Sequence, residues 1–364
     1  MKMLYFSFAR ANASIDGIYI NGLRKNGVGV INYSFHGLGG IRRYLKIAKC
    51  YSIHREAVDF IMVGYDSPLL VIFIWMISRK RIIYNALCSV YERLIISRAL
   101  AKEKSVKAYY YWFLDYLACH LANLVLVETN EQIKYFIKQF KIPASKLFRA
   151  LIGVDDDKFL YRDNVKKYEN FTVLFRGRLL PEAGGEFVVE AAKLLENSPI
   201  QFIMIANGMW LNKIQNRINE LGVKNLKLIS DFVPDEELCD YMQKSHLSLG
   251  QLSSHPRLER TIPHKAYESL ALKLPYLTAR SKGALELLKE GETCIVANQA
   301  DAKNLAEKIL WAYNNQKEIE KIAENGYKFF LENCTSKKLA RDLLERLTIN
   351  PVTFQRGIRP RRND

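Results

Sequence analysis

Short apolar runs typical of β-strands alternate with helical patterns along almost the whole chain, and this alternation constrains the fold more than any other feature. Chains built from such βαβ units fold into parallel sheets covered by helices, so the sequence predicts an α/β protein. Gly27 and Gly222 each follow a helical pattern, where a left-handed helix cap needs glycine. The expected strands are 3–8, 28–33, 172–175, 201–205 and 226–229, and the expected helices are 19–25, 187–195 and one that ends at 221.

The length of 364 residues exceeds what one hydrophobic core usually serves, so we expect two domains. A polar, weakly periodic stretch over 153–169 marks the boundary between them. The predicted parts are an N-terminal Rossmann-like domain over 1–155, a linker over 156–169, a C-terminal Rossmann-like domain over 170–348 whose last helix crosses back, and a basic, disordered tail over 349–364. Such sheets bind ligands beyond the carboxyl ends of their strands, so we expect the chemistry in a central cleft between the facing domains.

Positive charge is concentrated in the first part of the chain. Residues 1–150 contain 22 Lys and Arg against 9 Asp and Glu, whereas the remainder contains 32 against 29. A one-sided excess of this kind fits nucleic acid, an anionic membrane surface or a phosphorylated ligand. The charge alone does not choose among the three.

The cysteines and the N-terminus indicate a cytoplasmic protein. The six cysteines are scattered and form no CxxC pair, as expected of reduced core residues. The N-terminal apolar stretch is too short for a signal peptide. The longest apolar run, 69–77, is well short of the roughly 20 residues that span a bilayer.

The segment Arg176–Glu186, RGRLLPEAGGE, lies between a predicted strand and a predicted helix. Backbone N–H groups at a helix start attract phosphate, and an arginine on the preceding turn bridges two phosphate oxygens. We therefore expect Arg178 to bind a diphosphate, with Gly177 leaving room for close approach. A surface turn with a solvated arginine explains these residues equally well.

A second candidate site lies around Pro263. Proline suits the start of a helix, where its missing N–H costs nothing and the next amides are free to face a ligand. Lys265 would then lie beside a phosphate, and Glu268, three residues later on nearly the same face, would accept both hydroxyls of a ribose. The alternative is an i,i+3 surface ion pair that contributes about a few tenths of a kcal/mol.

This stretch resembles the donor-site signature of retaining family 4 glycosyltransferases of GT-B fold, in particular a bacterial surface-polysaccharide branch with the pattern IPNK-x-x-E-x-x-A. Here it runs from Ile262 to Ala271 as IPHKAYESLA. Further segments resemble the family in the same order along nearly the whole chain. They are GLRKNGVGV, LCSVYERLIISRALAK, LIGVDDDKF, FRGRLLPEAGG, ISDFVPDEELCDYM and GALELLKEGETCIV.

The chain departs from the family pattern at two places. The earlier of the family's two glutamates falls at Arg260, and Glu259 is one residue out of register. Contact of Arg260 with phosphate and replacement of the missing glutamate by Glu259 both stay open. The lysine before the glycine of the phosphate turn is also missing, since Glu182 and Ala183 stand there.

The resemblance implies transfer of a sugar from a nucleotide-diphosphate donor to a growing cell-surface or lipid-linked glycan, with retention, without a metal and without a cofactor. Such chemistry needs cations that take up charge on the leaving diphosphate. No Asp-x-Asp motif follows a strand, and 155–157 indicates a linker turn. The implied catalytic residues are Arg178, Lys265 and Glu268, and the implied donor-binding residues are Arg176, Gly177, Phe232, Val233, Arg260, Ile262, Pro263 and Glu286.

The N-terminal domain is expected to supply the acceptor side. Asn85 and Ser89 follow a strand-like run, where they either contact the donor sugar or acceptor or are plain turn residues. Ala101–Leu114 places three lysines before a run of aromatics, which suits a docking helix at the cytoplasmic face of the inner membrane. Consecutive aromatics cannot share one helix face, so some of them belong to the core.

Two other functions stay open. A sugar-nucleotide epimerase of the same fold would need acid and base carboxylates around the sugar, and the sequence offers no convincing pair. A nucleic-acid-binding protein would account for the basic N-terminal half, but no recognition motif is visible. We therefore expect a nucleotide sugar, a glycan acceptor and an anionic membrane surface as partners, and no nucleic acid.

Overall fold

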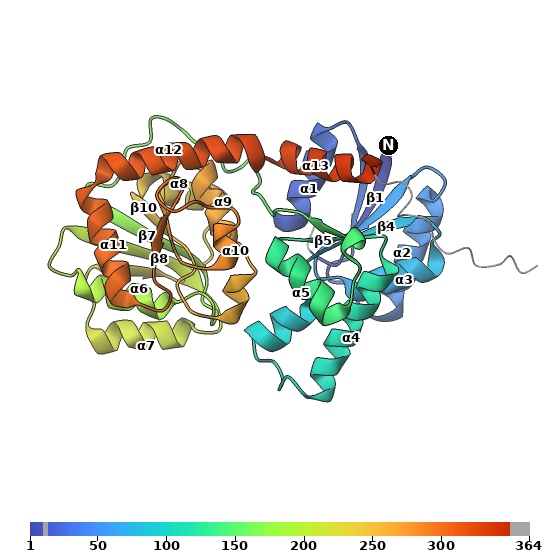
Figure 1. The fold of residues 1–364 in the computed structure, drawn as a ribbon, viewed down its shortest axis with the longest axis horizontal. Helices are drawn as coiled ribbons and strands as arrows, with labels where there is room; N and C mark the ends of the chain where they lie inside the picture. Colours follow the sequence, from blue (N-terminus) through green and yellow to red (C-terminus); the bar gives the residue numbers. More distant parts are fainter. Residues whose placement is uncertain (10–13, 350–364) are drawn as a thin grey trace, which may run out of the picture.

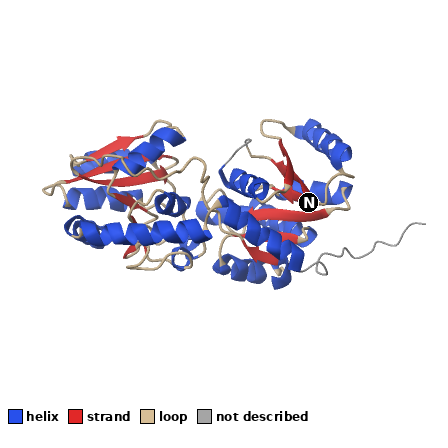
Figure 2. Ribbon diagram, turned by 90° about the horizontal axis from the view of Figure 1, so that it is seen from above, coloured by secondary structure: helices blue, strands red, loops and turns tan. Residues whose placement is uncertain are grey.

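The computed structural model describes residues 1–9 and 14–349, which form two α/β domains lying side by side (Figure 1). The predicted tail lies outside the described residues from 350 onward, and Ile349 is the last residue of the final helix. Seen from above, the two sheets and their covering helices stay separate, and a helical segment passes between the domains (Figure 2). The predicted class of two facing α/β domains is confirmed.

The N-terminal domain contains a six-stranded sheet of order β2-β1-β3-β4-β5-β6, and all its neighbouring strands pair in parallel. Its elements are β1 (Lys2–Ser7), α1 (Ser14–Lys25), β2 (Gly29–Ser34), α2 (Gly40–His54), β3 (Phe60–Val63), α3 (Pro68–Ile77), β4 (Arg81–Leu87), the π-helix η1 (Glu92–Ser97), α4 (Val106–Leu121), β5 (Leu124–Val127), α5 (Asn130–Phe140), the 3-10 helix η2 (Ala144–Lys146) and β6 (Leu147–Arg149). The direction of winding reverses between β1 and β3, because β2 lies on one side of β1 and the later strands on the other.

The C-terminal domain repeats this plan with the order β12-β11-β10-β7-β8-β9, again all parallel. Its elements are β7 (Phe171–Arg178), α6 (Gly185–Leu194), β8 (Ile200–Asn207), α7 (Leu211–Leu221), β9 (Leu226–Ile229), α8 (Asp235–Lys244), β10 (Leu247–Leu249), the 3-10 helix η3 (Pro256–Glu259), α9 (His264–Ala271), β11 (Tyr276–Ala279), α10 (Lys282–Leu285), β12 (Ile295–Ala297), α11 (Ala302–Asn314), α12 (Gln316–Asn333) and α13 (Ser336–Ile349). Here the winding reverses between β7 and β10, which makes the carboxyl ends of these two strands the expected ligand site.

Local sequence explains most element boundaries. Gly27 and Gly222 end their helices with φ values of 77° and 56°, as expected of glycine caps. The strands β3 and β5 are the apolar runs FIMV and LVLV and are buried along their whole length, because helices cover both faces of a parallel sheet. The apolar run at 69–77 forms the helix α3.

Strand β7 is longer than the sequence predicts. It continues through Arg176 and Gly177 to Arg178, and these residues pair with Ile205, Ala206 and Asn207 of β8. The expectation that they form a turn after the strand was therefore wrong. The physical reason is that β8 is also longer than expected and offers backbone partners as far as Asn207.

The last helix packs on the first domain. Figure 1 shows α12 leading out of the C-terminal domain and α13 lying against α1. A Cβ at Gly22 of α1 would lie 2.0 Å from the carbonyl oxygen of Ser336, so the close approach of the two helices needs glycine there. Lys25 adds contacts of 2.9 Å to Asp156 and 2.8 Å to Asp157. The chain thus passes between the domains twice, once between β6 and β7 and once between α12 and α13.

The six cysteines are all buried and none is paired in a disulfide, as the sequence predicts. Among residues 1–9 and 14–349, no helix has the length and apolarity needed to cross a bilayer.

Candidate functional site

The site is built on the carboxyl ends of β7 and β10. Gly177, the second-last residue of β7, has a φ of 127°, a value that L side chains rarely adopt. A Cβ there would lie 3.8 Å from Cε of Lys265, an ordinary contact distance, so the backbone angle and not the space is what favours glycine. Gly250 follows β10 directly, and its carbonyl oxygen accepts a hydrogen bond from Nζ of Lys265 at 3.1 Å. Lys265 therefore lies at the point where the winding of the sheet reverses.

Helix α9 carries Lys265 and Glu268 into this position. Pro263 immediately precedes the helix, so the first amides after it have no partner within the helix. The ammonium group of Lys265 is buried and also lies 4.0 Å from the centre of the Phe175 ring. Burial, together with the positive charge of Arg176, lowers the pKa of Lys265 well below its usual value. Among the described residues, no carboxylate forms an ion pair with the ammonium group of Lys265.

Glu268 is buried between a cation and an imidazole. Arg176 forms an ion pair with its Oε2, and Nδ1 of His264 lies 2.9 Å from its Oε1. Burial and the charge of Arg176 lower the pKa of His264 to about 3, so this imidazole is neutral. Burial lowers the pKa of Arg176 to about 10, which leaves the guanidinium charged at neutral pH. Arg176, Lys265 and Glu268 therefore form one cluster, which we call the β7 cluster.

Arg178 lies apart from the β7 cluster at the exposed tip of the strand. Its charge acts on Arg98 of the N-terminal domain, whose pKa is lowered by burial and by the charges of Arg93, Arg178 and Arg257. Arginines from both domains thus face the same space beyond β7. This arrangement suits a ligand with several negative charges.

Arg260 is not part of the β7 cluster. Its guanidinium contacts Oε1 of Glu92 in the N-terminal domain at 2.7 and 2.8 Å and lies 4.6 Å from the centre of the Tyr135 ring. Glu92 is completely buried and also accepts a hydrogen bond from Gln132 at 2.7 Å. In this structure a carboxylate of the other domain pairs with the guanidinium of Arg260, and binding of the donor by Arg260 stays a prediction.

Glu259 does not replace the missing glutamate either. Its carboxylate contacts the backbone N–H of Lys282 at 3.4 Å and Nε2 of Gln299 at 3.2 Å. Both contacts lie within the C-terminal domain, away from the β7 cluster. Glu268 is thus the single carboxylate that the family pattern brings to the end of β7.

Glu286 contacts the N-terminal domain. Its two carboxylate oxygens accept hydrogen bonds from the backbone N–H groups of Asn130 and Glu131, at 2.7 and 2.8 Å. These amides begin α5, where a carboxylate satisfies free N–H groups. Glu286 therefore joins the two domains in this structure, and its contact with the donor stays a prediction. Ile262 has a similar place, because its buried backbone N–H bonds to Glu128 of the N-terminal domain.

Phe232 and Val233 lie in the loop between β9 and α8. The ring of Phe232 is 89% exposed, and Val233 packs against the core. An exposed ring beside the carboxyl edge of the sheet is free to stack on a flat ligand. Its contact with a nucleobase stays a prediction.

Asn85 and Ser89 are interior residues. Asn85 belongs to β4 and lies next to Tyr5 and Asp16, whereas the hydroxyl of Ser89 accepts a hydrogen bond from the backbone N–H of Glu92 at 2.9 Å. Both side chains are almost completely buried. Strand β4 reaches as far as Leu87, so Asn85 belongs to the strand and not to a turn after it, and contact of either residue with the donor sugar or acceptor stays a prediction.

The structure adds residues that the sequence did not single out. Glu182, which stands where the family often has a lysine, pairs with Arg257 at 2.6 Å and accepts bonds of 2.9 and 3.0 Å from Ser97 of the N-terminal domain. Glu92 pairs with Arg260 as described above. No sequence signal could have found these partners, because each pair joins positions far apart in the chain.

A metal site is not apparent at the β7 cluster within the described residues. Asp155, Asp156 and Asp157 are the group of three acidic side chains that lie close enough together to hold an ion. Two of them contact Lys25, and Asp156 also bonds to Ser336 at 2.7 Å. They belong to the packing of α13 on the first domain, as the predicted linker turn suggests.

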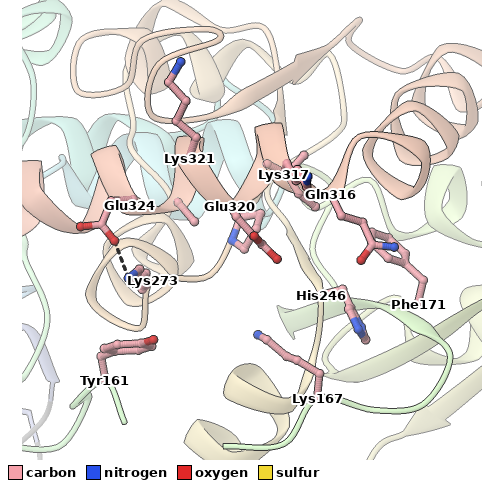
Figure 3. Close-up of a pocket in the computed structure, with 13 residues that line it drawn as sticks. Tyr161, Lys167, Phe171, His246, Lys273, Gln316, Lys317, Glu320, Lys321 and Glu324 are labelled. Carbon is pink, nitrogen blue, oxygen red and sulfur yellow. Dashed lines mark ion pairs between the residues drawn. The ribbon is translucent and has the colours of Figure 1, made fainter. Parts of the chain in front are cut away.

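A cavity of about 610 Å³ lies at the other edge of the C-terminal sheet (Figure 3). Phe171 begins β7 and His246 immediately precedes β10, so the cavity faces the amino ends of the strands, opposite the β7 cluster. Figure 3 shows the ion pair between Lys273 and Glu324 at its side. The chemistry of the β7 cluster therefore does not involve this cavity.

Comparison with known proteins links the C-terminal half to one family. Residues 156–329 match the model of glycosyl transferases group 1. The capsular polysaccharide biosynthesis glycosyltransferase CapM of Staphylococcus aureus is 24% identical over 268 residues, which are 70% of this chain and 69% of CapM. An uncharacterized glycosyltransferase of Methanocaldococcus jannaschii is 23% identical over 233 residues, 64% of this chain, and the match spans 61% of the archaeal protein.

Solved structures extend the likeness to both domains. HepE of Anabaena, in complex with UDP and glucose, has a TM-score of 0.73 and 16% identity, with 96% of this chain and 100% of HepE covered. The sucrose-phosphate synthase of Thermosynechococcus elongatus has a TM-score of 0.73 and 13% identity, with 95% of this chain and 98% of that protein covered. At these identities the likeness concerns the fold.

Proposed function

We propose that the protein transfers a sugar from a nucleotide-diphosphate donor to a glycan, starting from the match of residues 156–329 to the model of glycosyl transferases group 1. The observation that carries the proposal is the convergence of Lys265, Arg176 and Glu268 at the carboxyl ends of β7 and β10. Two cations suit a diphosphate, and a buried carboxylate suits the hydroxyls of a ribose or of the donor sugar.

In the proposed mechanism, the anomeric carbon is transferred with retention and without a metal ion. Departure of the diphosphate adds negative charge to its oxygens, which Lys265 and Arg178 would stabilise together with the first amides of α9. Burial and the charge of Arg176 lower the pKa of Lys265, and an arriving phosphate would raise that pKa and so favour the charged lysine. No cofactor is required, since the donor carries the activated bond.

The acceptor proposed is a growing cell-surface glycan, including one linked to lipid. CapM is named for capsular polysaccharide biosynthesis, which supports an acceptor of this class. The N-terminal domain would supply the acceptor side and would dock on the cytoplasmic face of the inner membrane.

Helix α4 supports docking because it has an exposed apolar face in addition to the face that packs into the domain. Val106, Tyr109, Tyr110 and Phe113 are spaced by three, one and three residues, which places them along one stripe of the helix, and each is at least half exposed. Trp112 lies instead against Phe140, so the aromatic run is divided between core and surface. We call the four exposed residues Val106, Tyr109, Tyr110 and Phe113 the α4 stripe. Apolar rings beside exposed lysines suit the interface of an anionic membrane.

The test is turnover of a panel of sugar nucleotides, beginning with UDP-glucose, by the purified full chain with a crude glycan-lipid extract as acceptor. We expect release of nucleoside diphosphate and incorporation of sugar into the lipid fraction. Glu268→Gln should lower kcat/KM by roughly a hundredfold or more, because a buried carboxylate loses its charge beside Arg176.

Glu237→Gln is the matched control, since Glu237 is an exposed residue of α8 and should keep wild-type turnover. An epimerase would instead return a changed sugar nucleotide without free nucleoside diphosphate. Unchanged turnover in Glu268→Gln would refute the assignment of the β7 cluster as the donor site.

A further inference from the structure

A second cavity, of about 290 Å³, lies in the N-terminal domain between α2, α3 and α4. Phe8 follows β1, Asp66 follows β3, and Val90 follows β4, so the cavity lies beyond the carboxyl ends of these strands. The winding of the sheet reverses between β1 and β3, and ligands of doubly wound sheets bind at such a reversal. We call this cavity the α2–α4 pocket.

Two arginines give the pocket a cationic side. Arg43 of α2 lies 4.5 Å from the centre of the Phe8 ring and donates from Nε to the carbonyl oxygen of Leu38. Arg93 of η1 pairs with Asp66. A guanidinium carries five N–H donors, so these contacts leave donors on both arginines for an anion. One carboxylate against two guanidinium groups leaves the lining with net positive charge.

The rest of the wall is apolar and reaches the surface. Leucine, valine, proline and aromatic side chains make up most of it, namely Phe8, Pro68, Leu69, Val90, Leu94, Tyr110, Tyr111 and Leu114. Leu69 is 40% exposed and Tyr110 is 50% exposed, and Tyr110 belongs to the α4 stripe. The mouth of the pocket is therefore continuous with the exposed apolar stripe of α4.

The pocket floor is held in place by a buried carboxylate. Asp115 of α4 accepts hydrogen bonds from the backbone N–H groups of Val90 and Tyr91, at 3.1 and 2.7 Å. These bonds fix the segment that leads into η1 and so position Arg93. The position of Arg93 relative to α4 is therefore set within the domain itself.

The pocket is also connected to the donor side by a series of positive charges. The charge of Arg93 in the pocket and the charge of Arg178 at the tip of β7 both lower the pKa of Arg98. An anion in the pocket would thus lie on the same side of the domain as the proposed donor diphosphate.

We propose that the α2–α4 pocket is the acceptor subsite and that it binds a phosphate ester carried on an apolar chain, with Arg43 and Arg93 at the phosphate and the chain passing Leu69 and Tyr110 toward the membrane. This inference rests on the proposed glycosyl transfer and names the class of its acceptor, a lipid-linked diphosphate. A membrane phospholipid shares the same chemistry, and the experiment separates the two.

The experiment measures binding of farnesyl diphosphate, a water-soluble analogue, to the full chain by calorimetry, beside inorganic diphosphate, farnesol and dioctanoyl phosphatidylglycerol. Farnesyl diphosphate should bind more tightly than each of the other three, because it alone offers both a diphosphate and an apolar chain. Arg43→Gln should weaken the binding of farnesyl diphosphate by roughly tenfold or more, which is the loss expected for one charge-assisted contact to phosphate. Arg42→Gln removes the same charge from the neighbouring, exposed position of α2 and should bind like wild type.

Three outcomes would overturn the proposal. Equal binding of farnesyl diphosphate by wild type and Arg43→Gln would remove the pocket as its site. Displacement of farnesyl diphosphate by UDP would assign it to the donor site, and equally tight binding of phosphatidylglycerol would make the pocket a headgroup site. UDP and GDP binding by the wild type is measured separately, so a failure of the donor site is distinguishable from a failure of this pocket. Arg93→Lys keeps the charge beside Asp66 and should also weaken the binding of farnesyl diphosphate.

Discussion

At the scale of single residues, the β7 cluster contains a buried lysine for which the described part of the chain supplies no ion-pair partner. Desolvation and the charge of Arg176 both disfavour the charged form of Lys265. His264 has a pKa of about 3 and Arg176 one of about 10, so neither changes its charge between about pH 6 and pH 9. Lys265 is therefore the group of these three that is expected to titrate when a ligand binds.

We predict that a nucleoside diphosphate takes up a proton as it binds. The phosphate raises the pKa of Lys265, so the bound state holds more protons than the free state and the affinity strengthens as the pH falls. Calorimetry of UDP binding in buffers of different ionisation enthalpy, at about pH 8 where phosphate groups are already deprotonated, should show a net uptake of protons. Lys265→Met should abolish the uptake.

Lys213→Met is the matched control, because Lys213 is a half-exposed residue of α7 that pairs with Glu186 outside the cluster. Its proton uptake should equal that of the wild type. Uptake that persists in Lys265→Met would show that another group takes the proton, contrary to the role given to Lys265.

At the scale of elements, helix α4 has two apolar faces with different environments. One face packs into the N-terminal domain through Ala108, Ala118 and Cys119, whereas the α4 stripe is exposed. Large apolar groups that line up on the outside of a helix mark an interaction surface more often than scattered ones do. The three lysines before and beside the stripe favour an anionic surface.

We predict that replacing both Tyr109 and Phe113 by Ser weakens binding to vesicles of phosphatidylcholine with phosphatidylglycerol at least about tenfold. The reason is that burial of each ring in the membrane contributes a free energy on the order of 1 kcal/mol. Vesicle flotation or tryptophan fluorescence would measure it. Leu331→Ser changes an equally exposed apolar residue on α12 of the other domain and should leave vesicle binding unchanged. Vesicle binding that survives the double substitution would place the membrane contact elsewhere.

At the scale of the whole molecule, buried charges connect the two domains. Arg260 and Arg257 from the C-terminal domain meet Glu92 and the Glu182–Ser97 pair at the interface. Burying a carboxylate such as Glu92 is costly unless it is paired, so separating the domains here would leave it either solvated or unpaired. The position at which the family has a glutamate is thus used by this chain for contact between domains.

We predict a strong coupling between Arg260 and Glu92. Arg260→Glu would place two carboxylates together and should lower the free energy of unfolding by about 3 kcal/mol or more, whereas adding Glu92→Arg should recover a large part of that loss. Denaturant unfolding of the four proteins of this cycle is the measurement. Swapping the exposed pair Arg162–Asp240 in the same way should change the free energy of unfolding by less than about 1 kcal/mol. Additive effects of Arg260 and Glu92 would contradict the coupling.

Much of the architecture could be predicted from the sequence. The strand over 226–229 has the predicted bounds, and the glycine caps at Gly27 and Gly222 are confirmed. Strand ends were less predictable, because the end of β7 depends on how far β8 offers backbone partners. At the site, the spacing of Pro263, Lys265 and Glu268 predicts that one short helix carries both side chains, and α9 does carry them, with Lys265 at the carbonyl of Gly250 and Glu268 paired with Arg176.

The sequence by itself determined the alternation that makes two parallel α/β domains and the local geometry of α9, since both follow from periodicity within a few residues. Only the tertiary structure decided which partner each charged side chain meets. Arg260 and Glu92 are 168 residues apart, and Glu286 and α5 more than 150, so their contacts arise from the packing of whole domains. A charge acts on what lies within a few ångströms of it, and distance along the chain carries no information about that neighbourhood.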